Sequence, residues 1–149
     1  MDDTYNLQRF IEAQDMVYPG VVEELQRGKK LSHWMWFIFP QIAGLGHSET
    51  AQRFAIRSLE EGRAYLNHPL LGERLINCTC LVNDVAGRSA GQIFGHPDDL
   101  KFRSSMTLFN AVDDTVTAFT RALERYFGGE PDTLTLDILA RQSGMNTKV

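Results

Sequence analysis

A chain of 149 residues has the length of one domain, and its composition, 43% hydrophobic and 23% charged, is that of a folded globular protein. The net charge of −4 lacks the basic excess that neutralises nucleic-acid phosphates, so we expect no nucleic-acid polymer as a partner. The longest apolar run, Trp34–Phe39, is far shorter than the roughly 20 residues of a membrane-spanning helix. The acidic amino terminus does not resemble a signal peptide. We therefore expect a soluble, cytoplasmic protein without membrane association, and the sequence indicates no particular protein partner.

Residues that start and stop helices recur along the whole chain at intervals typical of short helices. Caps, prolines suited to a first turn and the capping-box pair Ser58 and Glu61 mark the starts. In chain order the predicted starts are Asp3 or Thr4, Pro19, Ser48, Ser58, Pro69, Ser89, Pro97, Thr115 and Asp132. The first helix is predicted over about residues 4–16, and glycines end several others, among them Gly28, Gly87, Gly95 and Gly128.

No segment alternates apolar and polar residues between hairpin turns, as half-buried strands do. The aromatic run Trp34–Phe39 is the best strand candidate, but one strand would have no partner, so a short helix ending before Pro40 is favoured. The sequence thus predicts an all-α fold, a compact single-domain bundle of about seven to eight short helices with irregular packing. The domain is expected over residues 4–142, followed by a flexible carboxyl-terminal tail over residues 143–149.

Metal and disulfide chemistry have little support in the sequence. Cys78 and Cys80 lie two residues apart on a predicted helix, so their side chains point about 200° apart and cannot bridge or share a metal. They are interpreted as two buried or half-buried thiols. The four histidines show no pairing at helical spacing, so no metal and no cofactor are expected.

The most unusual segment is Ser32–Gln41, in which two tryptophans and two phenylalanines surround a methionine and an isoleucine. This density predicts a helix buried on nearly all sides. Core packing does not account for His33 and Gln41 at its ends, because buried polar groups need partners. Trp34 and Trp36 beside a histidine and an amide would also suit a pocket for a planar ring. His33 is thereby a candidate catalytic residue, and the other three are candidate ligand-binding residues.

The segment after it offers a place for an anion. Gly44 and Gly46 precede a predicted helix start, where backbone N–H groups can approach a phosphate, although a plain turn is the simpler interpretation. Arg53, one turn into that helix, would supply a cation and is a candidate ligand-binding residue.

A third candidate group lies on the helix predicted after Pro97. Lys101, Ser104 and Ser105 share one broad face of that helix. A lysine and two hydroxyl groups can form an anion site or a lysine-activated serine nucleophile, although small hydroxyl residues also suit close helix packing. Lys101 and Ser105 join His33 as candidate catalytic residues, and Ser104 is a candidate ligand-binding residue.

Several blocks of the sequence resemble the bacterial and fungal family catalogued as domain of unknown function 1810. The blocks are Gly28–Gln41, Gly44–Ser48, Ala64–Gly72, Ile93–Gly95, Asp98–Lys101, Ser104–Phe109 and Thr133–Leu136. The resemblance implies an all-helical fold and no assigned activity. The helical architecture is also similar, more faintly, to that of small proteins that act on ADP-ribose derivatives.

Two hypotheses of function follow. In the first, a small nucleotide-like, ADP-ribose-type or glycosidic anionic ligand is bound or hydrolysed in a cleft beside the His33–Trp36 helix. This requires the tryptophan segment and the helix of Ser104 and Ser105 to face one cleft. In the second, the chain is a non-enzymatic protein-interaction or structural module without a small-molecule site, and its polar residues serve the fold.

Overall fold

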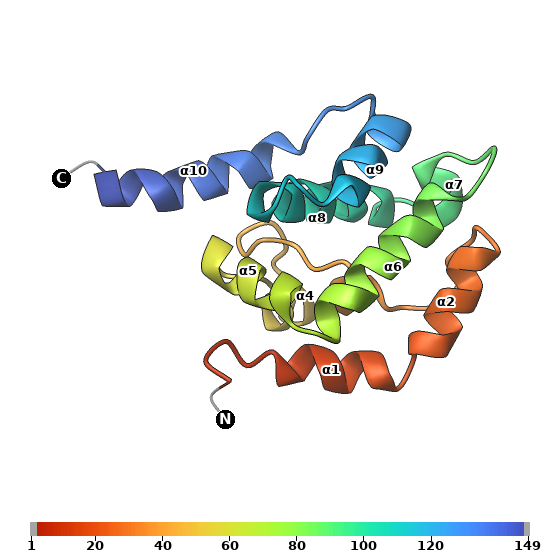
Figure 1. The fold of residues 1–149 in the computed structure, drawn as a ribbon, viewed down its shortest axis with the longest axis horizontal. Helices are drawn as coiled ribbons and strands as arrows, with labels where there is room; N and C mark the ends of the chain where they lie inside the picture. The colour runs from red at the N-terminus through yellow and green to blue at the C-terminus, as the bar shows by residue number, and fades with distance from the viewer. Residues whose placement is uncertain (1–2, 148–149) are drawn as a thin grey trace.

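The computed structural model describes residues 3–147, in which α-helices are joined by turns and loops (Figure 1). Its helices are α1 (Gln8–Asp15), α2 (Tyr18–Gln26), α3 (Met35–Ile38), α4 (Glu49–Arg53), α5 (Leu59–Asn67), α6 (Leu71–Asn83), α7 (Ala90–Phe94), α8 (Asp98–Val112), α9 (Thr117–Phe127) and α10 (Thr133–Thr147). The described residues contain no strand, only one parallel bridge between Ile42 and Ile56. The all-α prediction is therefore confirmed.

The number of helices is higher than the seven to eight predicted. Ten helices lie in the described residues, because α3, α4 and α7 are separate helices of only four or five residues. The helix predicted within Trp34–Phe39 is α3, and Trp34 and Phe39 flank it as buried residues. None of the helices in the described part is both long enough and apolar enough to cross a membrane.

Helix α8 lies at the centre of the fold and packs against α5, α7, α9 and α10 (Figure 1). Phe102, on its buried side, is fully enclosed and meets the rings of Phe39 and Phe94 at centroid distances of 4.9 and 4.7 Å. Apolar burial is the main favourable term in folding, so this aromatic cluster anchors the Ser32–Gln41 segment to the core.

A buried polar network joins α1 to the same segment. The Gln14 amide, 1% exposed, donates to the Phe37 carbonyl oxygen at 2.7 Å and to the Tyr65 hydroxyl at 3.0 Å. Burial raises the pKa of Tyr65, so its hydroxyl is protonated at neutral pH. These bonds fix the position of α1, and with it one wall of the site described below.

Several caps lie where the sequence predicts them. Ser48 accepts from the Ala51 N–H, Ser89 forms a capping box with Gln92, and Asp132 accepts from the Thr135 N–H. Helix α10 continues to Thr147, into the stretch predicted as a flexible tail over residues 143–149, whose last two residues lie outside the described part.

The two cysteines are free and differ in exposure. Cys78 is buried, whereas Cys80 is exposed, and the two face opposite sides of α6. The prediction that both thiols are at least half-buried is therefore wrong for Cys80. Burial raises the pKa of the Cys78 thiol to about 12.

We expect an aromatic disulfide reagent near pH 8 to modify one thiol per native chain, that of Cys80, and to modify Cys78 only after unfolding. Loss of the fast phase in Cys80→Ser would confirm the assignment, and two fast thiols in the wild type would contradict it.

Candidate functional site

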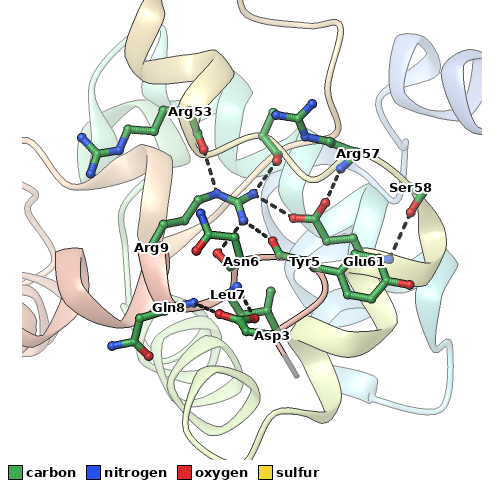
Figure 2. A network of polar contacts seen from close by, with 11 residues as sticks. Asp3, Tyr5, Asn6, Leu7, Gln8, Arg9, Arg53, Arg57, Ser58 and Glu61 are labelled. Atoms are coloured by element: carbon green, nitrogen blue, oxygen red, sulfur yellow. Dashed lines mark hydrogen bonds and ion pairs between the residues drawn. The ribbon is translucent and has the colours of Figure 1, made fainter. Parts of the chain in front are cut away.

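A polar hollow of about 570 Å³ lies between the amino-terminal segment, α1, α4 and the start of α5 (Figure 2). This volume is in the range of small-molecule sites. The lining residues are Thr4, Tyr5, Asn6, Gln8, Arg9, Glu12, Arg53, Arg57 and Glu61.

Arg9 holds the hollow together from the first turn of α1. Its Nε donates to the Arg53 carbonyl oxygen at 2.8 Å, and its Nη1 donates to the carbonyl oxygens of Tyr5 and Asn6 at 2.7 and 2.8 Å. The second terminal nitrogen, Nη2, donates to the Ala55 carbonyl oxygen at 2.9 Å and to Glu61 at 2.8 Å. A guanidinium has five N–H groups, so every donor of Arg9 is used within the protein. Arg9 is therefore a structural residue that joins three segments.

Glu61 is the carboxylate that balances Arg9. Its side chain is 3% exposed, and it also accepts from the Arg57 backbone N–H at 3.1 Å. Ser58 caps α5 by accepting from the Glu61 N–H, as predicted. The predicted capping box is wrong in its second half, because the Glu61 carboxylate binds Arg9 and the Arg57 N–H instead of the Ser58 N–H. A carboxylate this buried needs such partners to remain charged.

The turn before α1 forms another edge of the hollow. Asp3 accepts from the backbone N–H groups of Leu7 and Gln8 at 2.7 and 3.0 Å, so it caps α1 although the helix begins at Gln8 rather than near residue 4. The hydrogen bonds from Gln8 and Leu7 lower the pKa of the Asp3 carboxyl. Asn6, in the turn between Asp3 and Leu7, has a φ of +53°, in the left-handed region that asparagine tolerates well.

Two guanidinium groups in the hollow have no carboxylate partner among residues 3–147. Arg53 and Arg57 are exposed, and neither forms an ion pair within the described residues. The Arg53 guanidinium lies 5.2 Å from the centroid of the Phe54 ring and extends away from the Arg9–Glu61 pair (Figure 2). Because Arg9 pairs with Glu61, the remaining charged side chains of the lining are Arg53 and Arg57, which are positive, and Glu12, which is negative. The hollow therefore carries a net positive charge in an acidic chain.

Of the residues selected from the sequence, Arg53 lies in this hollow. Trp36 and Gln41 lie together around a much smaller space of about 10 Å³, enough for about one water molecule. Trp34 is 1% exposed, and its indole N–H donates to Glu24 at 2.9 Å, so it is a core residue with a polar anchor. His33 is exposed and lines none of the hollows described here.

Lys101, from the third candidate group, lies beside the tryptophan segment. Its Nζ lies 4.7 Å from the centroid of the Trp36 ring and 3.4 Å from Asp98, which also binds Lys30 at 2.9 Å. The Nζ of Lys30 in turn lies 5.2 Å from the Trp34 ring. The helix that carries Ser104 and Ser105 is thus adjacent to the tryptophan segment, through a cluster of two lysines and one carboxylate.

The two serines have structural surroundings. The Ser104 hydroxyl lies 3.1 Å from the Leu100 carbonyl oxygen and 2.9 Å from an Asp132 carboxylate oxygen, and its single proton is shared between these two acceptors. The contact with Asp132 ties α8 to the start of α10. Ser105 is fully buried, and its hydroxyl has no hydrogen-bond partner within the described residues. Neither His33 nor Lys101 contacts this hydroxyl, so the structure does not display a histidine- or lysine-activated serine.

Sequence reasoning missed Arg9, Arg57 and Glu61. The capping signature of Ser58 and Glu61 marked the right turn, but it did not indicate that Glu61 binds an arginine 52 residues earlier in the chain. Within residues 3–147, no group of three or more histidine, cysteine or acidic side chains is arranged to hold a metal ion.

The comparison with family models decides the classification. The model described as protein of unknown function (DUF1810) matches residues 4–139. The chain belongs to the DUF1810 family. This confirms the resemblance carried by the tryptophan-rich block and the later blocks.

A solved structure supports the same classification. The conserved hypothetical protein Rv1873 from Mycobacterium tuberculosis has a crystal structure that superposes on this DUF1810 protein with a TM-score of 0.92 and 55% sequence identity. The alignment covers 93% of this chain and 99% of the other. No curated protein matches the chain.

Proposed function

We propose that this DUF1810 protein binds a small anionic ligand in the hollow lined by Arg53 and Arg57. The observation that carries the proposal is the pair of guanidinium groups without a carboxylate partner in a hollow of about 570 Å³. Guanidinium groups bind phosphate and carboxylate groups through paired, charge-assisted hydrogen bonds. The clamp formed by Arg9 supports the proposal, because it holds the backbone of residues 53–57 in place before a ligand arrives.

The remaining lining residues favour a hydroxyl-rich body for the ligand. Asn6, Gln8 and Glu12 offer amide and carboxylate groups that can pair with hydroxyl groups, and Tyr5 is the one aromatic residue in the lining. A sugar phosphate, or the phosphoribosyl end of a nucleotide-like molecule, matches this surface better than a planar base. The proposed ligand class is the same as in the first hypothesis. The proposed binding site is the arginine hollow instead of a cleft beside the His33–Trp36 helix.

The carboxylates of the hollow support binding rather than hydrolysis. Glycoside hydrolysis uses two carboxyl groups, one as an acid and one as a base or nucleophile. Glu61 is committed to Arg9 and the Arg57 N–H, which leaves Glu12 alone.

The experiment compares ribose 5-phosphate, inorganic phosphate and uncharged ribose by thermal shift and titration calorimetry. We expect ribose 5-phosphate to stabilise the protein in a concentration-dependent way, because a ligand that binds only the native state raises its melting temperature. The double variant Arg53→Gln/Arg57→Gln should lose about tenfold or more in affinity, as expected for two charge-assisted contacts.

Arg63→Gln is the matched control, because Arg63 is exposed on α5 but does not line the hollow. This variant should bind like the wild type. Equal affinity of the wild type and the double variant, or no response to either phosphate compound, would refute the proposal and favour the protein-interaction hypothesis.

A further inference from the structure

A second hollow, of about 290 Å³, lies on another part of the surface, where the start of α2 meets the segment before α3. Its lining residues are Met16, Val17, Pro19, Gly20, Val21, Glu24, Ser32 and Trp34. It shares no residue with the arginine hollow, and its chemical character is the opposite: mainly apolar walls around a single acidic side chain.

Four neutral donors hold that acidic side chain in place. Glu24 Oε1 accepts from the backbone N–H groups of Leu31 and Ser32 at 2.7 and 3.1 Å and from the Trp34 indole N–H at 2.9 Å. Glu24 Oε2 accepts from the Ser32 hydroxyl at 2.6 Å. Oε1 thus accepts three hydrogen bonds and Oε2 only one, so Oε2 is the oxygen that can accept a further donor.

The charge of Glu24 has no counter-charge among the described residues. No lysine, arginine or histidine pairs with this carboxylate within the described residues. Lys30, whose Nζ lies 5.2 Å from the centroid of the Trp34 ring, pairs with Asp98, and its side chain is only 7% exposed. Burial opposes ionisation of Glu24, but hydrogen bonds from Ser32, Leu31 and Trp34 outweigh it and lower the pKa of the carboxyl. A half-buried, ionised carboxylate therefore stands unbalanced beside an apolar surface.

The walls of the hollow favour an apolar group. Met16 is 86% exposed, which is unusual for a side chain of this size and hydrophobicity, and Val17 and Pro19 extend the same surface. Gly20 leaves the wall open, because a Cβ atom there would meet nothing within 4 Å. The volume of about 290 Å³ suits a molecule with a ring and a short side chain rather than a folded segment.

We propose that this hollow binds a small organic ammonium ion, a primary amine carried on an apolar body, with the ammonium group on Glu24. The ammonium would donate to Oε2 and supply the missing counter-charge, while the apolar body would cover Met16, Val17 and Pro19. Charge complementarity favours a cation over the other ligand classes. The Glu24 carboxylate would repel an anion, and a neutral apolar molecule would leave its charge unpaired.

The test follows the Trp34 indole N–H, which donates directly to Glu24. The chain has two tryptophans, so a nitrogen-15 correlation spectrum shows two indole signals, and Trp36→Phe identifies them. Phenethylamine, titrated at neutral pH, should move the Trp34 signal to a saturating end point while the Trp36 signal stays in place. The uncharged analogue 2-phenylethanol should bind about tenfold more weakly or worse, since it lacks the ionic contact.

Glu24→Gln removes the charge, and Glu23→Gln is the control at the neighbouring position, whose side chain is 62% exposed. Glu24→Gln should abolish the preference for the amine, and Glu23→Gln should keep it. If Glu24→Gln does not fold, the comparison of amine and alcohol on the wild type decides alone. No movement of the Trp34 signal, or equal affinity for the two compounds, would overturn the proposal. Neither result touches the arginine hollow, which phosphate compounds test separately.

Discussion

Replacing Gly72 by alanine is expected to lower the free energy of unfolding by about 3 kcal/mol, among the largest effects of any single methyl group in this protein. Gly72 lies in the first turn of α6, where the chain returns from α5. A Cβ atom at this position would stand 1.9 Å from the Leu66 carbonyl oxygen, which is backbone and cannot rotate away. The two helices would have to separate, and the core that they cover would loosen with them.

Urea denaturation of Gly72→Ala measures this cost, and Gly20→Ala is the matched control. A Cβ atom at Gly20 meets nothing within 4 Å, and alanine is the better helix former. We expect Gly20→Ala to be neutral or to stabilise by up to about 1 kcal/mol. Equal stabilities of the two variants would mean that α5 and α6 lie further apart than the structure has them.

Arg9→Met is expected to lower the free energy of unfolding by about 3–5 kcal/mol, because it leaves the buried Glu61 carboxylate without its cation. The substitution also removes a hydrogen bond from each of four backbone carbonyl oxygens, those of Tyr5, Asn6, Arg53 and Ala55. The Asn6 oxygen keeps the bond from the Arg9 backbone N–H. The double variant Arg9→Met/Glu61→Gln should lose less than the sum of the two single variants, since the neutral amide no longer needs a counter-charge.

The exposed pair of Arg27 and Glu23 supplies the control for this cycle. Their side chains are 69% and 62% exposed at a distance of 2.9 Å. Arg27→Met should therefore change the free energy of unfolding by no more than about 0.5 kcal/mol. If Arg9→Met proved as mild as Arg27→Met in the same urea titration, Arg9 would not be the clamp that its five hydrogen bonds describe.

The fold was largely predictable because helix ends depend on neighbouring residues. Ser48, Ser89 and Asp132 cap their helices through bonds to residues three positions away, which the sequence displays directly. The aromatic density of Ser32–Gln41 likewise predicts burial, and Trp34 and Phe39 are buried. The separate short helices were harder to count, since four or five residues leave little periodicity to read.

The candidate site was less predictable because its contacts are distant in sequence. Arg53 could be selected from its place after a helix cap, but Glu61 meets Arg9 across 52 residues. Lys101 could be placed near Trp36 only by the packing of α8 against α3. The surroundings of Ser105 were also beyond the pattern, since the helix face that it shares with Lys101 does not indicate that its hydroxyl is fully buried and unbonded within the described residues.

The clamp of Arg9 also makes the arginine hollow depend on the position of residues 5–9. Local segments of a folded domain can open while the rest stays packed. Here residues 5–9 are bonded to residues 53–61, so detachment of the amino-terminal segment would dismantle one wall of the hollow while the aromatic centre around Phe102 stayed packed. Local opening of residues 5–9 would therefore abolish binding before the aromatic centre unfolds, whereas loss of the Arg9 side chain itself would also lower the free energy of unfolding.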